Sequence, residues 1–360
     1  MPDAIWIDRD DELPALARTL ESQGWIGVDT EFLRERTFFP KLCLLQLAAG
    51  GQIWCVDTLR IGSLDALMPV LTVATLRKVI HAARQDLEAV YLTSKRVMTP
   101  VFDTQIAAGC IGLKPQVGYA ELVKTLLNVT VPKGQTRTDW SKRPLTREQL
   151  EYAADDVSYL GDIANHLILR LRELGREHWV LEDCRALEDN ELYEPDPAQA
   201  WGRLRGLAQL APAPRARAKA VAVWRERQAR ARDLPRAWIL PDADIFSIAQ
   251  GAPPPLNDSL AASLSDALEV SSHDEPDQEP GQDARPTPEQ KALIERLSKI
   301  VDSRAAELKV SAEILAPRGE LKALAMATRA SAPRDSHALT GWRREEIGTR
   351  LLEAIGQEPV

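Results

Sequence analysis

Short apolar runs, separated by polar and helix-forming segments, fill the first part of the chain. The runs are rich in β-prone residues and predict five strands, at residues 25–32, 41–49, 52–58, 78–82 and 101–103. Apolar residues at helical spacing predict three helices, at residues 10–20, 62–73 and 85–93. Gly50 and Gly51 separate two of the strands and predict a hairpin. Together these elements indicate an α/β domain with a mixed sheet.

The pattern is helical from about residue 105 to residue 190. Apolar residues repeat at helical spacing over residues 119–128. The sequence Thr146-Arg-Glu-Gln149 has the form of a capping box and predicts the start of a long helix that carries Tyr152 and Asp156. The segment Glu194-Pro-Asp-Pro197 then interrupts the helical pattern, which indicates a domain boundary.

Two small helical modules are predicted beyond this boundary, and their similar patterns indicate a diverged internal duplication. The segment between them, residues 271–288, is acidic, rich in proline and without aromatic residues, which is typical of a disordered or extended linker. The predicted organisation is a first domain at residues 1–190, a module at 198–268, a linker at 269–288 and a second module at 289–360.

The composition is that of an ordinary soluble protein, with 360 residues of which 44% are hydrophobic and 27% charged. No apolar run approaches the length that spans a bilayer, and the acidic N-terminus lacks the apolar stretch of a signal peptide. The four cysteines have neither metal-ligand spacing nor the pattern of a disulfide framework. We therefore expect no membrane association and a location in the reducing cytoplasm.

The net charge of −8 argues against a nucleic-acid partner, but the charge is unevenly distributed. Between Trp201 and Leu240, ten Lys or Arg residues are opposed only by Glu226 and Asp233. A local excess of positive charge is typical of a surface that binds a polyanion. A solvated basic helix face has the same composition, so both interpretations stay open.

Carboxylates occur at three places that the predicted elements would bring together. Asp29 and Glu31 are two residues apart on a strand, so both point to the same face. Tyr152 and Asp156 are four apart on a helix and share one face of it. Asp86 is expected at the start of a helix that follows a strand, a position that also suits the helix dipole without any ligand. Each pattern alone is common, whereas the series in this order is specific.

Carboxylates that repel one another in one pocket are most often held together by divalent metal ions. Oxygen ligands without His or Cys favour Mg²⁺ or Mn²⁺ over zinc. Four acids with two such ions predict two-metal hydrolysis of a phosphodiester. Tyr152 is a poor base at neutral pH, so we expect its hydroxyl to orient the attacking water. Asp155 lies about 100° round the helix from Asp156 and is expected to be structural rather than a ligand.

Three segments resemble the three motifs of the DEDD exonuclease superfamily: Val28-Asp29-Thr-Glu31-Phe, His81-Ala-Ala-Arg-Gln-Asp86 and Tyr152-Ala-Ala-Asp-Asp156. The Tyr in the third motif is typical of the DEDDy branch. Residues 138–145 resemble the segment that precedes the last motif in ribonuclease D. Residues 224–225 and 234–238 resemble HRDC domains, while the second module lacks the Pro-Arg-Xaa-Trp stretch. The resemblance covers about residues 20–355 of the chain.

This resemblance implies a nuclease domain with an RNase H-like mixed sheet, followed by two small all-α HRDC-like domains. It implies metal ligation by Asp29, Glu31, Asp86 and Asp156, with Tyr152 as a further catalytic residue. The implied activity is that of a 3′–5′ exoribonuclease with two divalent metal ions, which trims 3′ extensions of structured RNAs, notably tRNA precursors, and releases 5′-mononucleotides. No obligate protein partner is implied. The alternatives are a DNA exonuclease of the same superfamily and a catalytically silent RNA-binding scaffold.

Further residues are expected to contact RNA: Thr30, Phe32, Arg143, Arg225, Arg227 and Arg230. Phe32 would suit the core equally well, and Arg143 would also serve to cap the loop before it. Gln46 is a polar residue in an apolar strand and is a candidate to line the pocket. His81 is better interpreted as a core histidine than as a ligand.

Overall fold

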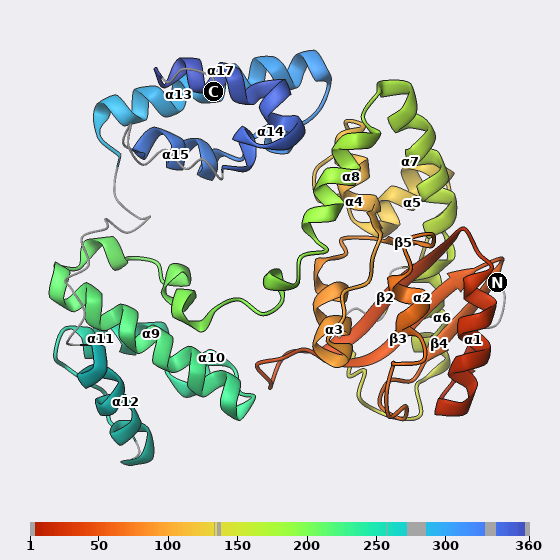
Figure 1. The fold of residues 1–360 in the computed structure, drawn as a ribbon, viewed down its shortest axis with the longest axis horizontal. Helices are drawn as coiled ribbons and strands as arrows, with labels where there is room; N and C mark the ends of the chain where they lie inside the picture. Colours follow the sequence, from red (N-terminus) through yellow and green to blue (C-terminus); the bar gives the residue numbers. More distant parts are fainter. Residues whose placement is uncertain are drawn as a thin grey trace. The chain divides into compact units, whose positions relative to one another are not determined.

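The computed structural model describes residues 4–132, 134, 138–256, 258–271, 286–327 and 336–356. The chain divides into two compact units, whose elements are drawn in Figure 1. The first, here called the sheet unit, comprises Met1–Leu33, Lys41–Tyr193 and Thr287–Val360. The second, here called the helical unit, comprises Arg34–Pro40 and Glu194–Pro286.

A mixed six-stranded sheet forms the centre of the sheet unit, in the order β1-β4-β3-β2-β5-β6. The strands are β1 (Ile5–Ile7), β2 (Trp25–Leu33), β3 (Lys41–Ala49), β4 (Gln52–Val56), β5 (Arg77–Ile80) and β6 (Val101–Asp103). The pairs β2–β3 and β3–β4 are antiparallel and the other pairs are parallel. Gly50 and Gly51 both have positive φ, which confirms the predicted hairpin turn. The predicted α/β fold with a mixed sheet is thus confirmed, and only β1 was not foreseen.

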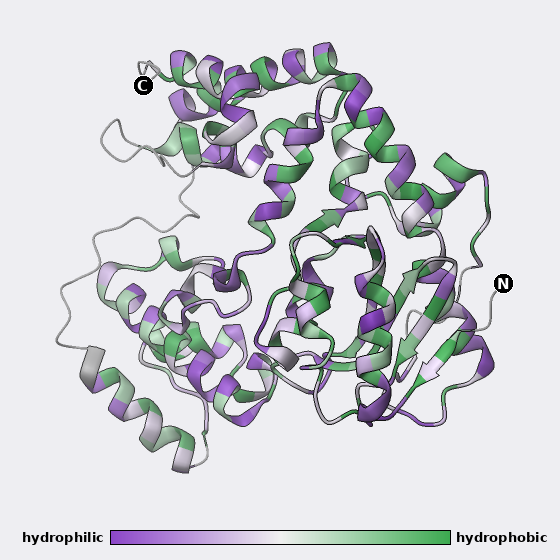
Figure 2. Cartoon of the chain, turned by 45° about the vertical axis from the view of Figure 1, so that its right-hand side comes forward, coloured by the Kyte–Doolittle hydropathy of each residue, from purple (hydrophilic) through white to green (hydrophobic). Residues whose placement is uncertain are grey.

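Helices cover both faces of this sheet. On one face, α1 (Leu13–Glu21), α2 (Met68–Thr72) and α3 (Arg84–Ser94) pack on alternate strand residues such as Val28 and Leu45. On the other face lie α6 (Arg147–Ser158) and α7 (Leu160–Leu174), and a Cβ added to Gly27 of β2 would lie 3.3 Å from the side chain of Leu160. Hydrophilic and hydrophobic residues alternate round these helices (Figure 2), as expected where one side faces a sheet.

The long helix α6 begins where the sequence predicts. The hydroxyl of Thr146 accepts from the backbone N–H of Gln149 at 3.2 Å, and the Gln149 side chain accepts from the N–H of Thr146 at 2.9 Å. The predicted capping box is therefore confirmed, and it sets which α6 residues face the sheet. The helix predicted at residues 62–73 is shorter, because Pro69 restricts α2 to a start at Met68.

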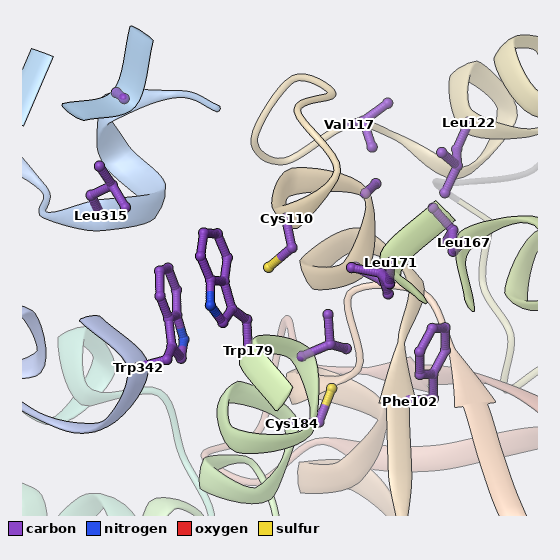
Figure 3. Close-up of a cluster of buried hydrophobic side chains, with 14 of the residues drawn as sticks. Phe102, Cys110, Val117, Leu122, Leu167, Leu171, Trp179, Cys184, Leu315 and Trp342 are labelled. Carbon is purple, nitrogen blue, oxygen red and sulfur yellow. The ribbon is translucent and has the colours of Figure 1, made fainter. Parts of the chain in front are cut away.

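Three further helices complete the first part of the sheet unit: α4 (Thr104–Cys110), α5 (Tyr119–Leu127) and α8 (Glu177–Ala186). The C-terminal helices of the same unit are α13 (Pro288–Leu308), α14 (Ala312–Leu315), α15 (Arg318–Met326), α16 (Gly341–Arg343) and α17 (Thr349–Ala354). They pack on α4 and α8 through two stacked indoles, Trp179 and Trp342, whose ring centroids are 3.9 Å apart (Figure 3). The guanidinium of Arg343 donates two hydrogen bonds to Asp183 of α8, at 2.5 and 2.8 Å.

The helical unit contains α9 (Pro212–Arg232), α10 (Arg236–Ile239), α11 (Asp242–Ala249) and α12 (Asp258–Ser271) around an apolar core. Residues 34–40 belong to it: the backbone N–H groups of Phe38 and Phe39 each donate to Asp233 at 3.0 Å. The predicted linker falls largely on residues 272–285, which lie outside the described residues. Among the described residues, no helix is both long and apolar enough to cross a membrane.

Candidate active site

Three carboxylates converge on the face of the sheet that α6 covers. Asp29 and Glu31 point to this face from β2, and Asp156 reaches it from α6. One oxygen from each of the three lies within 4.8 Å of the others. The i, i+2 spacing therefore places Asp29 and Glu31 side by side on β2 as expected, and the packing of α6 on the sheet adds Asp156.

Asp86 joins this cluster from the first turn of α3. Its side chain is buried, and the Thr30 hydroxyl donates to its Oδ1 at 2.5 Å. The charge of Asp86 is the largest electrostatic influence that raises the pKa of Asp29, so the two acids are close neighbours. The fourth predicted acid thus lies beside the other three, and Thr30 fixes its orientation.

Asp103 organises the start of α3, a role that the sequence analysis missed. Its carboxylate accepts from the backbone N–H groups of Ala82 and Ala83, at 3.1 and 2.8 Å. The same carboxylate caps α4 by accepting from Gln105 N at 2.7 Å. Its place between a strand and a helix was a visible capping signal, but its contact with the loop before Asp86 depends on how β5 and β6 pair.

Burial raises the pKa of every acid in the cluster, and the charges of the other cluster acids raise the pKa of Asp29 and of Glu31 further. The pKa of Glu31 rises to about 8, through burial first and then the charges of Asp156 and Asp86. Burial raises the pKa of Asp86 and of Asp156 to about 7 each. That of Asp29 lies well above its ordinary value for the same reasons. Such a site binds protons unless divalent cations replace them, and its oxygen-only donors suit Mg²⁺ or Mn²⁺.

Tyr152 lies one turn before Asp156 on α6, and its hydroxyl lies close to the Asp156 carboxylate. Burial, followed by the charges of Asp156 and Glu31, raises the pKa of the phenol above its ordinary value. The ring lies 6.1 Å, between centroids, from that of the buried Trp140. At neutral pH this phenol is a proton-bearing donor with a fixed ring, not a base.

Known proteins resemble both the fold and this site. A family model described as 3′-5′ exonuclease matches residues 4–172, and one described as HRDC domain matches residues 215–262. Ribonuclease D of Pseudomonas paraeruginosa is 32% identical to this chain over 98% of each protein. Ribonuclease D of Xanthomonas oryzae pv. oryzae is 37% identical over 92% of this chain and 93% of its own. The chain belongs to the ribonuclease D family.

Members of the ribonuclease D family are 3′–5′ exoribonucleases, and so is this protein. The crystal structure of Escherichia coli RNase D superposes with a TM-score of 0.88 at 28% identity, covering 99% of this chain and all of the other. This match confirms the predicted order of a nuclease domain followed by a helical HRDC region. It also decides against the DNA exonuclease and the silent scaffold.

Two other residues of this ribonuclease D family member have the structural roles expected for them. Asp155 is buried on α6, outside the group of three close acids, and its backbone oxygen accepts from the Tyr119 hydroxyl at 2.9 Å. His81 has one ring nitrogen 2.8 Å from the Thr104 hydroxyl and the other 3.0 Å from the Val117 carbonyl. Both ring nitrogens are thus used within the fold.

Three residues of the nuclease domain that were expected to contact RNA make contacts within the fold. Thr30 is buried and bonded to Asp86, and Phe32 packs against the core on the α1–α3 face. Arg143 donates to both oxygens of the buried Asp57, at 2.7 Å each, and to the carbonyls of Trp140 and Cys43. Arg143 therefore holds its loop to the sheet, which is the capping alternative rather than the phosphate contact.

The three arginines of α9 have different surroundings. Arg225 is buried, and its guanidinium donates to Leu240 O at 3.0 Å and Asp242 Oδ1 at 2.5 Å. Arg230 donates to the carbonyl of Pro195 and lies over the ring of Phe38. Arg227 is exposed. Two of the arginines expected to bind RNA thus serve the core of the helical unit, because their partners lie on elements distant in sequence.

Proposed function

We propose that this exoribonuclease trims the 3′ extensions of structured RNAs such as tRNA precursors and releases 5′-mononucleotides. The Escherichia coli enzyme that matches the whole chain is described as an exoribonuclease involved in structured RNA processing, which supports this choice of substrate. The observation that carries the chemistry is the convergence of Asp29, Glu31 and Asp156 on one face of the sheet, with Asp86 close to Asp29.

We propose that these four carboxylates hold two divalent ions, Mg²⁺ or Mn²⁺. When bound, such ions lower the pKa of a water and stabilise the departing 3′ oxygen. The donor set fits this use, because every donor is a carboxylate oxygen and burial raises the pKa of each acid, so that a bound cation would stabilise the ionised form.

The protein's own groups set the geometry of the reaction in this proposal. Thr30 holds the Asp86 carboxylate in one orientation through its 2.5 Å hydrogen bond. Tyr152 retains its proton at neutral pH, because its pKa is raised, and orients the attacking water through its hydroxyl. Asp103 acts indirectly, because its carboxylate fixes the start of α3, the helix that carries Asp86.

We propose that exposed arginines of the helical unit hold the body of the RNA. Besides Arg227, they include Arg205, Arg217 and Arg232, all of them exposed. Contacts with phosphates supply most of the affinity that does not depend on sequence. We assign this role to the exposed arginines rather than to Arg225 and Arg230, because a guanidinium that is bound inside the fold is not available to a phosphate.

We also propose a cytoplasmic location for the enzyme. All four cysteines are free and buried. Free thiols are typical of proteins that work in a reducing compartment.

The test uses two RNAs with 5′ labels, a tRNA precursor with a 3′ extension and a single strand of the same 3′ sequence, and a DNA copy of the strand. With Mg²⁺ or Mn²⁺ we expect a ladder that shortens from the 3′ end on both RNAs and stops at the structured body of the precursor. Chelation should abolish the ladder, and Asp29→Asn is the matched inactive control. Cleavage that persists with chelator, or that starts inside the chain, would contradict the proposal.

A further inference from the structure

A fully buried amide, Gln46, lies in the middle of the sheet. It is on the central strand β3, where its neighbours Leu45 and Leu47 are also fully buried. Neither Oε1 nor Nε2 of Gln46 has a hydrogen-bond partner among the described residues. Burial of an unpaired amide opposes folding, and a Met or Leu of similar size would avoid this cost. The presence of an amide here therefore points to a use other than packing.

The strand register puts Gln46 directly opposite Asp29. The two residues are paired in the antiparallel ladder between β2 and β3, so their side chains leave the same face of the sheet. Directly opposed residues on such a pair have Cβ atoms about 4.5–5.5 Å apart. On its other side Gln46 is paired with Cys55 of β4, a buried free thiol.

The face that carries Gln46 is the face of the active site. Gly27, on the same side of β2, meets Leu160 and Val157 at the junction of α6 and α7. Ala153 of α6 packs with Leu44 and Cys55 in one buried cluster. The Gln46 amide thus lies between the sheet and α6, beside Asp29 and shielded from solvent.

We propose that Gln46 is a positioning residue for Asp29. This inference rests on the proposed function, in which Asp29 is a metal ligand. A ligating carboxylate is oriented by hydrogen bonds to its second oxygen, and loss of such a partner typically weakens metal binding or activity by about 10–100-fold. In this proposal Nε2 of Gln46, which has no partner among the described residues, donates to the second oxygen of Asp29 when metal ions are bound. Gln46 itself touches neither the RNA nor the reacting atoms.

The decisive variant is Gln46→Met, which keeps the length of the side chain and removes its donor and acceptor. In the full-length protein we expect a urea midpoint, measured without metal, equal to or above that of the wild type. We expect the Kd for Mn²⁺, measured by calorimetry on the protein without RNA, to rise about 10–100-fold. The kcat should fall at limiting Mn²⁺ and recover at high Mn²⁺, while KM for a short RNA stays unchanged. Stability that is kept while metal affinity falls is the signature of positioning.

Leu45→Met is the matched control, since it lies on the same strand, is equally buried and faces α1–α3 instead of α6. It should change neither the Kd for Mn²⁺ nor kcat. Wild-type Mn²⁺ affinity in Gln46→Met would overturn the inference, and so would a parallel loss of stability and affinity, because Gln46 would then serve only the core. Asp29→Asn separates the two proposals: if it stays active, the proposed metal site is wrong, whereas an inactive Asp29→Asn with a normal Gln46→Met rejects only the inference on Gln46.

Discussion

The contact between the C-terminal helices and α8 can be tested by one substitution, Arg343→Met. The Arg343 side chain is only 6% exposed, and it donates to both oxygens of Asp183, whose own side chain is 12% exposed. Met keeps the aliphatic volume but leaves Asp183 with the Trp342 indole N–H, at 3.0 Å, as its nearest hydrogen-bond donor. Removal of one partner of a buried ion pair costs about 3–5 kcal/mol, because the other charge stays buried. Because the Trp342 indole N–H still donates to Asp183, we expect a cost at the lower end of this range, about 3 kcal/mol.

Hydrogen exchange measures this loss locally. Each 1.4 kcal/mol is a factor of ten, so we expect the slowest amides of α13 and α15 to exchange about 100-fold faster, with the central strands much less affected. Cleavage of a short single-stranded RNA should persist, because none of the site acids lies at this contact. Arg344→Met is the matched control, since Arg344 is the exposed neighbour, and it should change stability by less than about 0.5 kcal/mol.

A second variant tests the assigned cause. In Arg343→Met combined with Asp183→Leu no unpaired charge remains, so most of the lost protection should return. Wild-type exchange in Arg343→Met would refute the argument that this ion pair holds the C-terminal helices. Equal losses in the single and the double variant would show that packing, not the unpaired carboxylate, sets the cost.

Four further predictions concern the site and the basic helix. Asp156→Asn should abolish hydrolysis with a melting temperature near that of the wild type; retained activity would reject the metal assignment. Tyr152→Phe should lower kcat roughly 100-fold with unchanged Mn²⁺ affinity in calorimetry, because only the orienting hydroxyl is lost. The folded state raises the pKa of Glu31 from 4.5 to about 8, so between these pH values the folded protein holds a proton that the unfolded chain has lost. Urea unfolding without metal should therefore show stability falling as pH rises through this range, by up to about 5 kcal/mol, and Mg²⁺ should restore it. Arg227→Gln should weaken binding of a tRNA precursor and reduce the slope of log K against log salt by roughly 0.7–0.9, whereas Arg225→Gln should mainly lower the melting temperature.

The sequence was sufficient to predict those features of the fold and the site that a local residue pattern determines. Strand alternation gave the central sheet, and the capping box gave the register of α6. Once these elements are known, the period of a strand places Asp29 and Glu31 on one face of β2. The period of a helix fixes the side of α6 on which Asp156 lies. The pocket of acids could therefore be anticipated before any contact was known.

Roles that depend on tertiary contacts could not be anticipated. Arg225 and Arg227 are two residues apart in a basic helix, and composition treats them alike. One is buried because Asp242 and the Leu240 carbonyl come to it from α11 and the segment before it, while the other faces solvent. Thr30 was expected to face the nucleotide, but its hydroxyl bonds to Asp86, 56 positions away. A hydroxyl or guanidinium has several possible partners, and only the packing of distant segments decides among them.

The charge balance of the site links metal and substrate binding. Burial, together with the other acids, is the main influence that raises the pKa of Glu31, and the same holds for Asp29. Without metal the pocket therefore repels a phosphate whenever its acids are ionised, and a phosphodiester can approach only where divalent charge is present. The exposed arginines of the helical unit can hold RNA regardless of metal, since their charge is permanent. We accordingly expect chelation to abolish cleavage but to leave most of the affinity for a structured RNA; an equal loss of both would mean that the metal site, not the basic surface, holds the substrate.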